Sequence, residues 1–418
     1  MNRTINLSLV FLGAALAAMP PGARAAESRV VKVAAIVTEY RHNSHADILI
    51  SRLLQTDTLD GKGNDSPLKL VSLYTDQKPS NDISRMLSAS HRFPIFDSIA
   101  GALTLGTGQL AVDGVLVIGE HGNYPKSPNG NTQYPKRRFL QEVFQVFRQS
   151  SRVVPVFSDK HLADNWRDAQ WIYKTARALH VPLMAGSSIP TTWRKPPVDV
   201  ARGSRVQEIV ALTYGPTDAY GFHALEMVQA LAEQRQGGET GIASVQCLAD
   251  DAVWEAAARH DYDPALFRAA WDRLSDTAND GRPLAEAVPH PVLFSLFYAD
   301  GLRAHILELN GAVNQWTAAW RYEGTGNIES TQFQVQDARP GMHFTYLLHG
   351  IEQMMLSGTP AWPVERTLLT SGALDALLTS KLQGGVRLAT PYLVFSYQSP
   401  WRWQQPPPPP PGRPWAEQ

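Results

Sequence analysis

Short apolar runs alternate with helical periodicity from Val30 to about Gly186. This alternation is typical of a parallel sheet that carries helices on both faces. Ser44, followed by Asp47, fits a capping box and predicts a helix that starts at Ser44. The predicted strands are Val31–Val37, Leu68–Tyr74, Gly114–Ile118, Val153–Phe157 and Pro182–Ala185, and the predicted helices are Ser44–Leu54, Phe96–Leu105, Arg138–Arg148 and Trp166–Leu179.

The pattern changes after a proline-rich joint at Pro190–Asp199, where longer strand-like runs are separated by turns. Such runs favour a mainly antiparallel sheet with helices on one face. The predicted strands are Arg205–Tyr214, Ile242–Leu248, Val292–Tyr298, Ala304–Asn310, Trp316–Tyr322 and Ser330–Val335, and the predicted helices are His223–Gln234, Pro264–Leu274, Met342–Leu356 and Val364–Ser380.

The fold class predicted from these patterns is α/β. A Rossmann-like parallel-sheet domain over residues 29–195 precedes an α+β domain over 200–398 with a mainly antiparallel open sheet. The segment 401–418 contains the unbroken prolines Pro406–Pro411, which predict an exposed, disordered tail with polyproline II character.

Composition adds limits to this picture. The chain has 418 residues, 44% hydrophobic content and a formal net charge of -1, so it has material for two globular domains and no charge excess that would recruit nucleic acid. The lone Cys247 permits no internal disulfide and is given no role.

The first residues predict export. Arg3, the apolar run Leu7–Met19 and the small residues around Arg24 match a signal peptide over residues 1–25, which implies a periplasmic or secreted protein. The apolar run is shorter than the roughly 20 residues that span a bilayer, and no later stretch is long enough. We therefore expect no integral membrane segment after cleavage.

The turn after the first strand would hold a dinucleotide in a Rossmann-like domain, through glycines that let the backbone approach the pyrophosphate. Here Glu39 and Tyr40 would fill that approach, and a carboxylate about 4 Å from a phosphate charge costs on the order of 4 kcal/mol. NAD(P) is therefore the less favoured cofactor. If a nucleotide does bind, its candidate contacts are Thr38, Glu39, Tyr40, Arg41 and Asp76.

Two stretches give a resemblance to a known family. Residues 152–190, "RVVPVFSDKHLADNWRDAQWIYKTARALHVPLMAGSSIP", look like a strand ending in E-K-P, a helix and a further strand, and residues 218–231, "DAYGFHALEMVQAL", look like a D-x-G-x-H-x-x-D segment. With a weaker match at 362–380, the chain resembles the Gfo/Idh/MocA family, the relatives of glucose-fructose oxidoreductase and inositol dehydrogenase, over roughly residues 30–395. The resemblance places Lys160 at the family's catalytic lysine and His223 at its histidine. It also implies that the second domain binds the substrate and that the open face of its sheet mediates a homo-oligomer.

The departures from the family pattern are as informative as the matches. The glycine fingerprint is lost at residues 38–43, Asp159 stands in place of Glu, and His161 in place of Pro. Ala219 occupies the position of the family's aspartate, and Asp218 lies one residue earlier.

Ligands of this fold class bind outside the carboxyl ends of the parallel strands, where several polar residues follow strand ends. Imidazoles together with carboxylates suit a divalent metal such as zinc, manganese or iron, although their spacing matches no known signature. The cofactor is therefore left unassigned, with a divalent metal as one alternative. The candidate metal ligands are His42, His45, Glu120, His121, His161 and Glu226.

The predicted chemistry is acid–base chemistry on a small carbohydrate-like ligand. Lys160 and His223, with Asp218, are the candidate catalytic residues, because an amine in a cleft and an imidazole can move protons near neutral pH. Without nicotinamide they could enolise a keto-sugar, which leads to elimination, hydration or epimerisation. Two alternatives stay open: an NAD(P)-dependent sugar or polyol oxidoreductase with an atypical cofactor loop, and a non-catalytic sugar-binding or scaffold protein.

Overall fold

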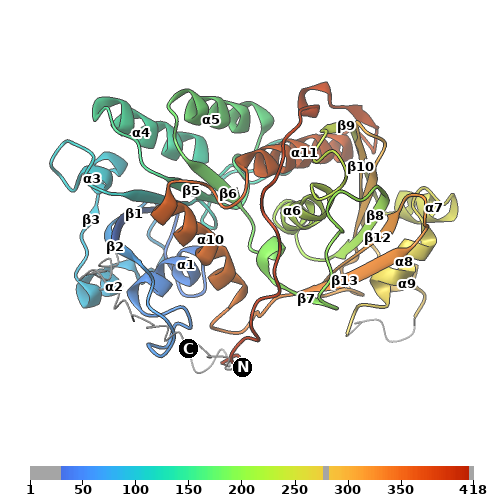
Figure 1. Ribbon diagram of the computed structural model, residues 1–418, viewed down its shortest axis with the longest axis horizontal. Coiled ribbons are helices and arrows are strands. Elements are labelled where there is room, and N and C mark those ends of the chain that lie inside the picture. The colour runs from blue at the N-terminus through green and yellow to red at the C-terminus, as the bar shows by residue number, and fades with distance from the viewer. Residues whose placement is uncertain (1–29, 276–281, 414–418) are drawn as a thin grey trace, which may run out of the picture.

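The computed structural model describes residues 30–275 and 282–413. The predicted signal peptide at 1–25 lies outside the described residues. Two sheets form the centres of two lobes that lie side by side (Figure 1). Among the described residues, no helix combines the length and the apolar character needed to cross a membrane.

The first sheet is six-stranded and parallel, in the order β3-β2-β1-β4-β5-β6. Its inner strands are almost entirely buried, because helices cover both faces. One face packs on α1 and α10, and the other on α3, α4 and α5. The elements are β1 (Val31–Val37), α1 (His45–Leu54), β2 (Leu68–Thr75), α2 (Ser84–His91), β3 (Ile95–Phe96), α3 (Ile99–Thr104), β4 (Gly114–Ile118), α4 (Lys136–Gln149), β5 (Val156–Asp159), α5 (Trp166–Ala178) and β6 (Leu183–Gly186).

The second sheet is eight-stranded, in the order β14-β9-β10-β11-β8-β12-β13-β7, and it is antiparallel except for the β11–β8 pair. The predicted fold class, with one parallel and one mainly antiparallel sheet, is confirmed. The elements are β7 (Trp193–Lys195), β8 (Val206–Thr213), α6 (Tyr220–Ala232), β9 (Ile242–Ala249), α7 (Asp251–Ala258), α8 (Pro264–Trp271), α9 (Leu284–Ala287), β10 (Val292–Tyr298), β11 (Arg303–Glu308), β12 (Trp316–Tyr322), β13 (Ile328–Gln334), α10 (His343–Ser357), α11 (Val364–Leu382) and β14 (Leu388–Ala389), with short 3-10 turns at Ile189–Thr191 and Pro391–Leu393.

Both faces of this sheet are covered, where the sequence predicted one. Helices α6 and α11 pack on one face. On the other face, Val210, Leu212 and Leu307 pack against Val253 of α7 and Leu266 of α8. The face that we expected to mediate a homo-oligomer is therefore occupied by the chain's own helices.

The start of one strand and the limits of one domain differ from the prediction. Strand β5 begins at Val156, because Pro155 has no N–H to donate to the sheet. Helix α10, although it follows the second sheet along the chain, packs against α1 on the first sheet through Leu347 and Ile351. The lobe of the first sheet therefore includes residues from the segment predicted as the second domain.

Residues 401–413, which we call the C-terminal strap, run down the front of the molecule between the two lobes (Figure 1). The indole of Trp193 donates to the carbonyl of Pro407 at 2.7 Å, and the hydroxyl of Tyr346 donates to the same carbonyl at 2.9 Å. Trp403 donates to the carbonyl of Thr192 at 2.8 Å. The expectation of a disordered tail is thus wrong for these residues, because aromatic side chains from both lobes bind the strap's carbonyls.

The strap gives a stability prediction. A chain that ends at Pro400 loses these hydrogen bonds, worth about 1 kcal/mol each, together with buried indole area. We expect its free energy of unfolding to fall by on the order of 3 kcal/mol in a denaturant titration. A chain that ends at Arg413 is the matched control and should unfold like the full chain; equal stability of all three would show that the strap does not brace the fold.

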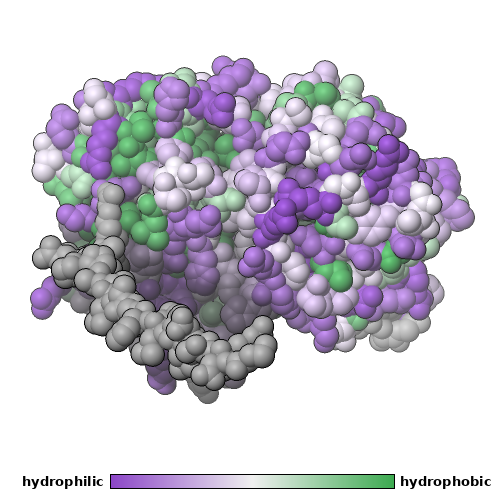
Figure 2. Space-filling view, viewed as in Figure 1, coloured by the Kyte–Doolittle hydropathy of each residue, from purple (hydrophilic) through white to green (hydrophobic). Residues whose placement is uncertain are grey.

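Figure 2 shows the surface on the same side. Hydrophilic residues are spread over both lobes, and apolar residues form smaller groups among them.

Candidate functional site

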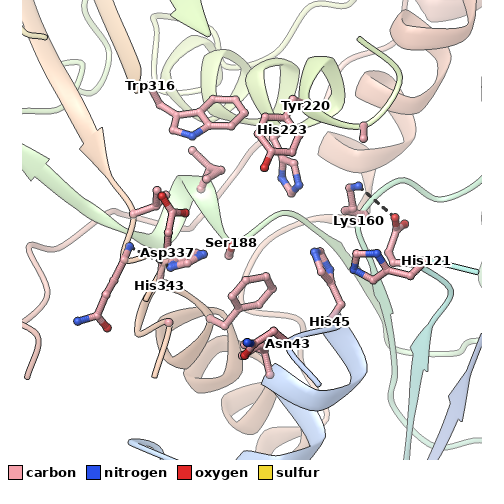
Figure 3. Close-up of a pocket in the computed structure, with 18 of the residues that line it drawn as sticks. Asn43, His45, His121, Lys160, Ser188, Tyr220, His223, Trp316, Asp337 and His343 are labelled. Atoms are coloured by element: carbon pink, nitrogen blue, oxygen red, sulfur yellow. Dashed lines mark hydrogen bonds and ion pairs between the residues drawn. The ribbon is translucent and has the colours of Figure 1, made fainter. Parts of the chain in front are cut away.

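A cavity of about 480 Å³ opens where the carboxyl ends of the parallel strands meet α6, β12 and the segment 335–344 (Figure 3). Ligands of open parallel sheets bind at this end of the strands, so its position agrees with the sequence-based expectation. Its polar lining is Asn43, His45, Glu120, His121, Tyr134, Lys160, Ser188, Tyr214, Tyr220, His223, Gln336, Asp337 and His343, and Ile48, Ile189, Trp316, Val335 and Phe344 add apolar surface.

Lys160 points into the cavity from the end of β5 as part of a buried charge cluster (Figure 3). Its Nζ lies 3.1 Å from Glu120 Oε2, and the Nζ of the fully buried Lys136 donates to Glu120 Oε1 at 2.7 Å. Burial raises the pKa of Glu120, but the charges of Lys136 and Lys160 outweigh burial and bring this pKa well below its ordinary value. Glu120 is therefore an anion held between two cations, and one of these cations faces the ligand space.

The backbone at this cluster is unusual. Lys160 has a φ of 56° and His121 a φ of 68°, and neither is glycine. Such left-handed residues cost of order 1–3 kcal/mol each and concentrate at functional sites. Lys160 is fixed in this conformation by its N–H, which donates to the carbonyl of Gly186 at 3.0 Å.

His45 enters the cavity from the first turn of α1. The side chain of Ser44 caps this helix, as predicted, by accepting from the N–H of Asp47. Nδ1 of His45 lies 2.6 Å from Oδ2 of Asp159, a carboxylate that is only 1% exposed. The ring of Phe344 packs edge-on against the imidazole, with centroids 4.9 Å apart. His45 is thus held by a hydrogen bond on one edge and by packing on its face.

His223 approaches from α6 on the other side of the cavity (Figure 3). Its Nδ1 lies 2.5 Å from the hydroxyl of Ser187, and its ring centroid lies 6.4 Å from that of His45. Burial, reinforced by the charge of Lys160, brings the pKa of His223 well below its ordinary value. His223 is therefore a neutral imidazole at neutral pH.

Two further histidines complete the polar wall. Burial, with smaller effects of neighbouring cations, lowers the pKa of His121 and of His343 to about 3 each. Opposite them, the rings of Tyr220 and Trp316 lie 5.4 Å apart and offer an aromatic surface beside Asp337. The cavity thus combines one ammonium group, neutral imidazoles and an aromatic wall.

The structure places two of the three predicted catalytic residues in the cavity. Lys160 and His223 both line the cavity. Asp218 does not, because its Oδ2 accepts from the Thr132 hydroxyl at 2.8 Å and from Lys126 Nζ at 3.1 Å. Asp218 therefore ties the loop before α4 to the second lobe.

Of the six predicted metal ligands, His45, Glu120 and His121 line the cavity together, and the other three do not. His42 lies near Asp47, with Nδ1 3.6 Å from Oδ2, and is absent from the cavity lining. Glu226 is fully buried and accepts from Thr367 and Thr370 of α11. Glu120 is held by two lysines. In residues 30–275 and 282–413, no three His, Cys, Asp or Glu side chains form a group that could hold a metal ion.

His161 is also structural, although it follows Lys160 directly. Its ring packs between Phe222 and Tyr134, with centroids 5.6 Å and 5.9 Å away. Burial, together with the charge of Lys136, lowers its pKa to about 3. It replaces the proline of the family pattern as a packed neutral ring.

This burial predicts a pH effect on stability. The folded-state pKa of about 3 lies below the unfolded value near 6.5, so the contribution of His161 is present above about pH 6.5 and is lost as the pH falls toward 3. A glutamine cannot take up the proton. We compare the free energies of unfolding of His161→Gln and the unsubstituted protein by denaturant unfolding. When the pH is lowered from 7 to about 4.5, we expect the variant to become more stable relative to the unsubstituted protein by about 2–3 kcal/mol. The same gap at both pH values would contradict this assignment.

The predicted nucleotide site is filled by the chain itself. Tyr40 is fully buried, and its hydroxyl lies 2.8 Å from that of Ser51. At the start of α1, Asp47 accepts from the N–H of Asn43 at 2.8 Å and from Arg339 at 2.9 Å. A buried carboxylate thus occupies the helix N-terminus, where a pyrophosphate would bind. The first-turn residues do not fit a dinucleotide.

The other predicted nucleotide contacts are also engaged by protein groups. Asp76, the candidate ribose partner, accepts from Tyr74 and Tyr124, both at 2.8 Å, and from Arg138. The hydroxyl of Thr38 donates to the carbonyl of Glu120 at 2.5 Å. The remaining candidate contacts, Glu39 and Arg41, pair with each other at 2.6 Å. All five predicted nucleotide contacts therefore have protein partners.

Sequence reasoning did not single out Ser187, Asp337 or His343. Ser187 could have been found as a polar residue directly after β6, at the same edge of the sheet as Lys160. Asp337 lies in the loop before α10 and His343 is the first residue of α10, and only the packing of α10 on α1 brings them to the cavity.

Comparisons with solved structures agree with this architecture. GenD2 from gentamicin A biosynthesis, solved in complex with NAD, superposes with a TM-score of 0.55 at 14% identity, over 89% of this chain and 99% of that chain. Myo-inositol dehydrogenase from Corynebacterium glutamicum ATCC 13032 and apo scyllo-inositol dehydrogenase from Lactobacillus casei each superpose with a TM-score of 0.51 at 10% identity, over 86% of this chain and 98% of theirs. The resemblance to Gfo/Idh/MocA dehydrogenases is thus confirmed for the fold. No family model and no curated protein matches the sequence.

Proposed function

We propose that this protein is an enzyme that abstracts the proton beside the carbonyl of a cyclic keto-sugar or a related polyhydroxylated ketone, without a bound nicotinamide. The observation that carries the proposal is one cavity in which the ammonium of Lys160 faces neutral imidazoles while the dinucleotide path is filled by protein side chains. The leader at residues 1–25 supports the further proposal that this chemistry takes place after export.

Each part of the cavity has a role in this reaction. The aromatic surface of Tyr220 and Trp316 suits the apolar face of a sugar ring, and Lys160 suits an oxygen that gains negative charge. When the C–H bond breaks, its electron pair forms a C=C bond and the carbonyl oxygen becomes an enolate oxygen beside the ammonium. His223 exchanges a proton with a neighbouring substrate oxygen or carbon.

The fate of the enolate sets the product. Return of a proton to the opposite face of the carbon gives an epimer. Loss of the oxygen substituent on the next carbon, protonated as it leaves, gives an unsaturated ketone, and addition of water reverses that step.

Two alternatives are separated from this proposal by specific observations. The fold similarity to GenD2, a protein solved with NAD, favours a sugar or polyol oxidoreductase, but this activity needs a nucleotide to displace Asp47 from the start of α1. A non-catalytic sugar-binding protein needs the aromatic wall but no oriented imidazole, whereas His45 and His223 each have a hydrogen-bonded partner.

Proton exchange tests the proposal. The protein, freed of nucleotide by gel filtration, is incubated in D₂O with 2-keto-myo-inositol, methyl 3-keto-glucopyranoside or fructose, and NMR follows the proton beside the carbonyl. We expect exchange or product formation with at least one of the two cyclic ketones, at least about 10³-fold above the buffer rate. Buffer-level exchange with all three ketones would contradict the proposal.

A further inference from the structure

We infer that His45, oriented by Asp159, is the base that removes the carbon-bound proton, so that the first turn of α1 presents a proton acceptor to the substrate. This inference rests on the proposed function and deepens it, since it assigns the central step to a residue pair outside the lysine and histidine of the family pattern.

The first argument is the hydrogen bond itself. Of the four histidines that line the cavity in the described part of the chain, His45 alone is hydrogen-bonded to a carboxylate. His121 contacts Arg41, and His223 contacts Ser187. A carboxylate on Nδ1 holds the N–H tautomer there, directs the lone pair of Nε2 to the substrate, and stabilises the imidazolium that forms on proton uptake.

The second argument is burial. Asp159 is 1% exposed, so water does not compete for its contact with His45. The side chain of His45 is itself 16% exposed and faces the cavity (Figure 3). One edge of the imidazole is thus fixed inside the protein, and the other edge is open to a ligand.

The third argument concerns the other imidazoles of the cavity. Burial lowers the pKa of His121, His223 and His343, which makes each of them a weak proton acceptor. His223, with a hydroxyl rather than a carboxylate on Nδ1, is better suited to move a proton to and from a substrate oxygen.

The fourth argument is the shared origin of the base and the cation. Asp159 ends β5, and Lys160 is the next residue, in a left-handed conformation. Consecutive residues therefore place the orienting carboxylate against α1 and the ammonium in the cavity. This arrangement fixes the base relative to the group that stabilises the enolate oxygen, which is the preorganisation that proton abstraction beside a carbonyl requires.

The step balances within the cavity. The C–H bond breaks, its proton goes to Nε2 of His45, and its electron pair forms the C=C bond of an enolate whose oxygen lies beside Lys160. His45, now an imidazolium, then returns the proton to the carbon or gives it to the oxygen that leaves the next carbon, and it is neutral again after either step. No oxidant or reductant is consumed.

The test uses the full chain and the deuterium-exchange assay with 2-keto-myo-inositol and methyl 3-keto-glucopyranoside. We expect His45→Gln to lower exchange by at least about 10³-fold, and Asp159→Asn by about 10²- to 10⁴-fold, because an amide favours the wrong tautomer. His223→Gln should retain exchange. His91→Gln, an exposed histidine at the end of α2, is the matched control and should exchange like the unsubstituted protein.

A second measurement separates chemistry from folding. Added imidazole should restore part of the exchange in His45→Ala, and it should not do so in Asp159→Asn. Asp159 is a positioning residue, so its asparagine variant should also shift the pH profile of exchange. Circular dichroism and thermal unfolding are used to check that the compared variants are folded.

The outcomes distinguish this inference from the proposal beneath it. Exchange by the unsubstituted protein that persists in folded His45→Gln overturns the assignment of His45 and leaves the proposed function standing. Absence of exchange in the unsubstituted protein overturns the proposed function. Loss of exchange in both dyad variants, with imidazole rescue of His45→Ala, supports the assignment.

Discussion

Replacing Lys160 by methionine is expected to lower keto-sugar turnover by about 10²- to 10³-fold, with little change in fold. Methionine fills nearly the same volume but carries no charge, so under the proposed function the enolate oxygen would lose its stabilising cation. Removal of one such donor from a preorganised site costs about 10²- to 10³-fold in rate. Glu120 keeps its contact with Lys136 in this variant, so its carboxylate stays paired.

The matched control is Lys126→Met. Lys126 is a mostly exposed lysine that pairs with Asp218 and does not line the cavity. Its turnover should remain within about twofold of the original, since an exposed ion pair contributes at most about 1 kcal/mol to stability. Equal losses in the two variants would show that Lys160 acts through general electrostatics and not on the substrate. Steady-state rates with the ketone that exchanges fastest provide the comparison.

Lys136→Met is expected to have the largest effect on stability. Lys136 is fully buried and donates to Glu120 and to the carbonyls of Asp159 and His161, each at 2.7 Å. Removing it leaves a buried carboxylate with one partner and two carbonyls without their donor. Breaking a buried ion pair from one side costs about 3–5 kcal/mol. Denaturant unfolding at neutral pH should show a loss of this size.

A double variant sharpens this prediction. Glu120→Gln removes the buried charge that Lys136 no longer helps to balance, so Lys136→Met combined with Glu120→Gln should be more stable than Lys136→Met alone. The double variant could instead be less stable than Lys136→Met by the whole loss that Glu120→Gln causes on its own. The two residues would then act independently, and their pairing would contribute nothing to the free energy of unfolding. Lys174→Met, on the exposed surface of α5, serves as a control for the loss of a lysine.

The layered fold was predictable because its strands are short apolar runs bounded by turns. Residues that directly follow these runs were therefore expected at the carboxyl edge of the sheet. Lys160 and Glu120 follow β5 and β4, and the structure brings them within 3.1 Å. Strand order alone places such residues at one edge of a parallel sheet.

Other parts could not be read from local pattern. Glu226 follows His223 at helical spacing, yet one side chain faces α11 and the other the cavity. The wall formed by Asp337 and His343 depends on α10 returning to the first sheet, which is a long-range contact. The strap depends on aromatic residues from both lobes, so proline content alone did not reveal its binding site.

The loss of the glycine loop now has a structural interpretation. Asn43 and Asp47 close the helix terminus that binds phosphate in dinucleotide folds, and Arg339 neutralises the carboxylate from the second lobe. Under the proposed function, the same turn contributes His45. The turn that binds a cofactor in dinucleotide folds would here supply the residue that accepts a proton.

Calorimetric titration of the purified full chain with NAD⁺, NADH, NADP⁺ and NADPH tests this account most directly. Because Asp47 and Arg339 occupy the pyrophosphate position, we predict no saturable binding of any of the four nucleotides below about 1 mM, equivalent to less than about 4 kcal/mol of binding free energy. Stoichiometric binding of one nucleotide with a micromolar dissociation constant would contradict the account.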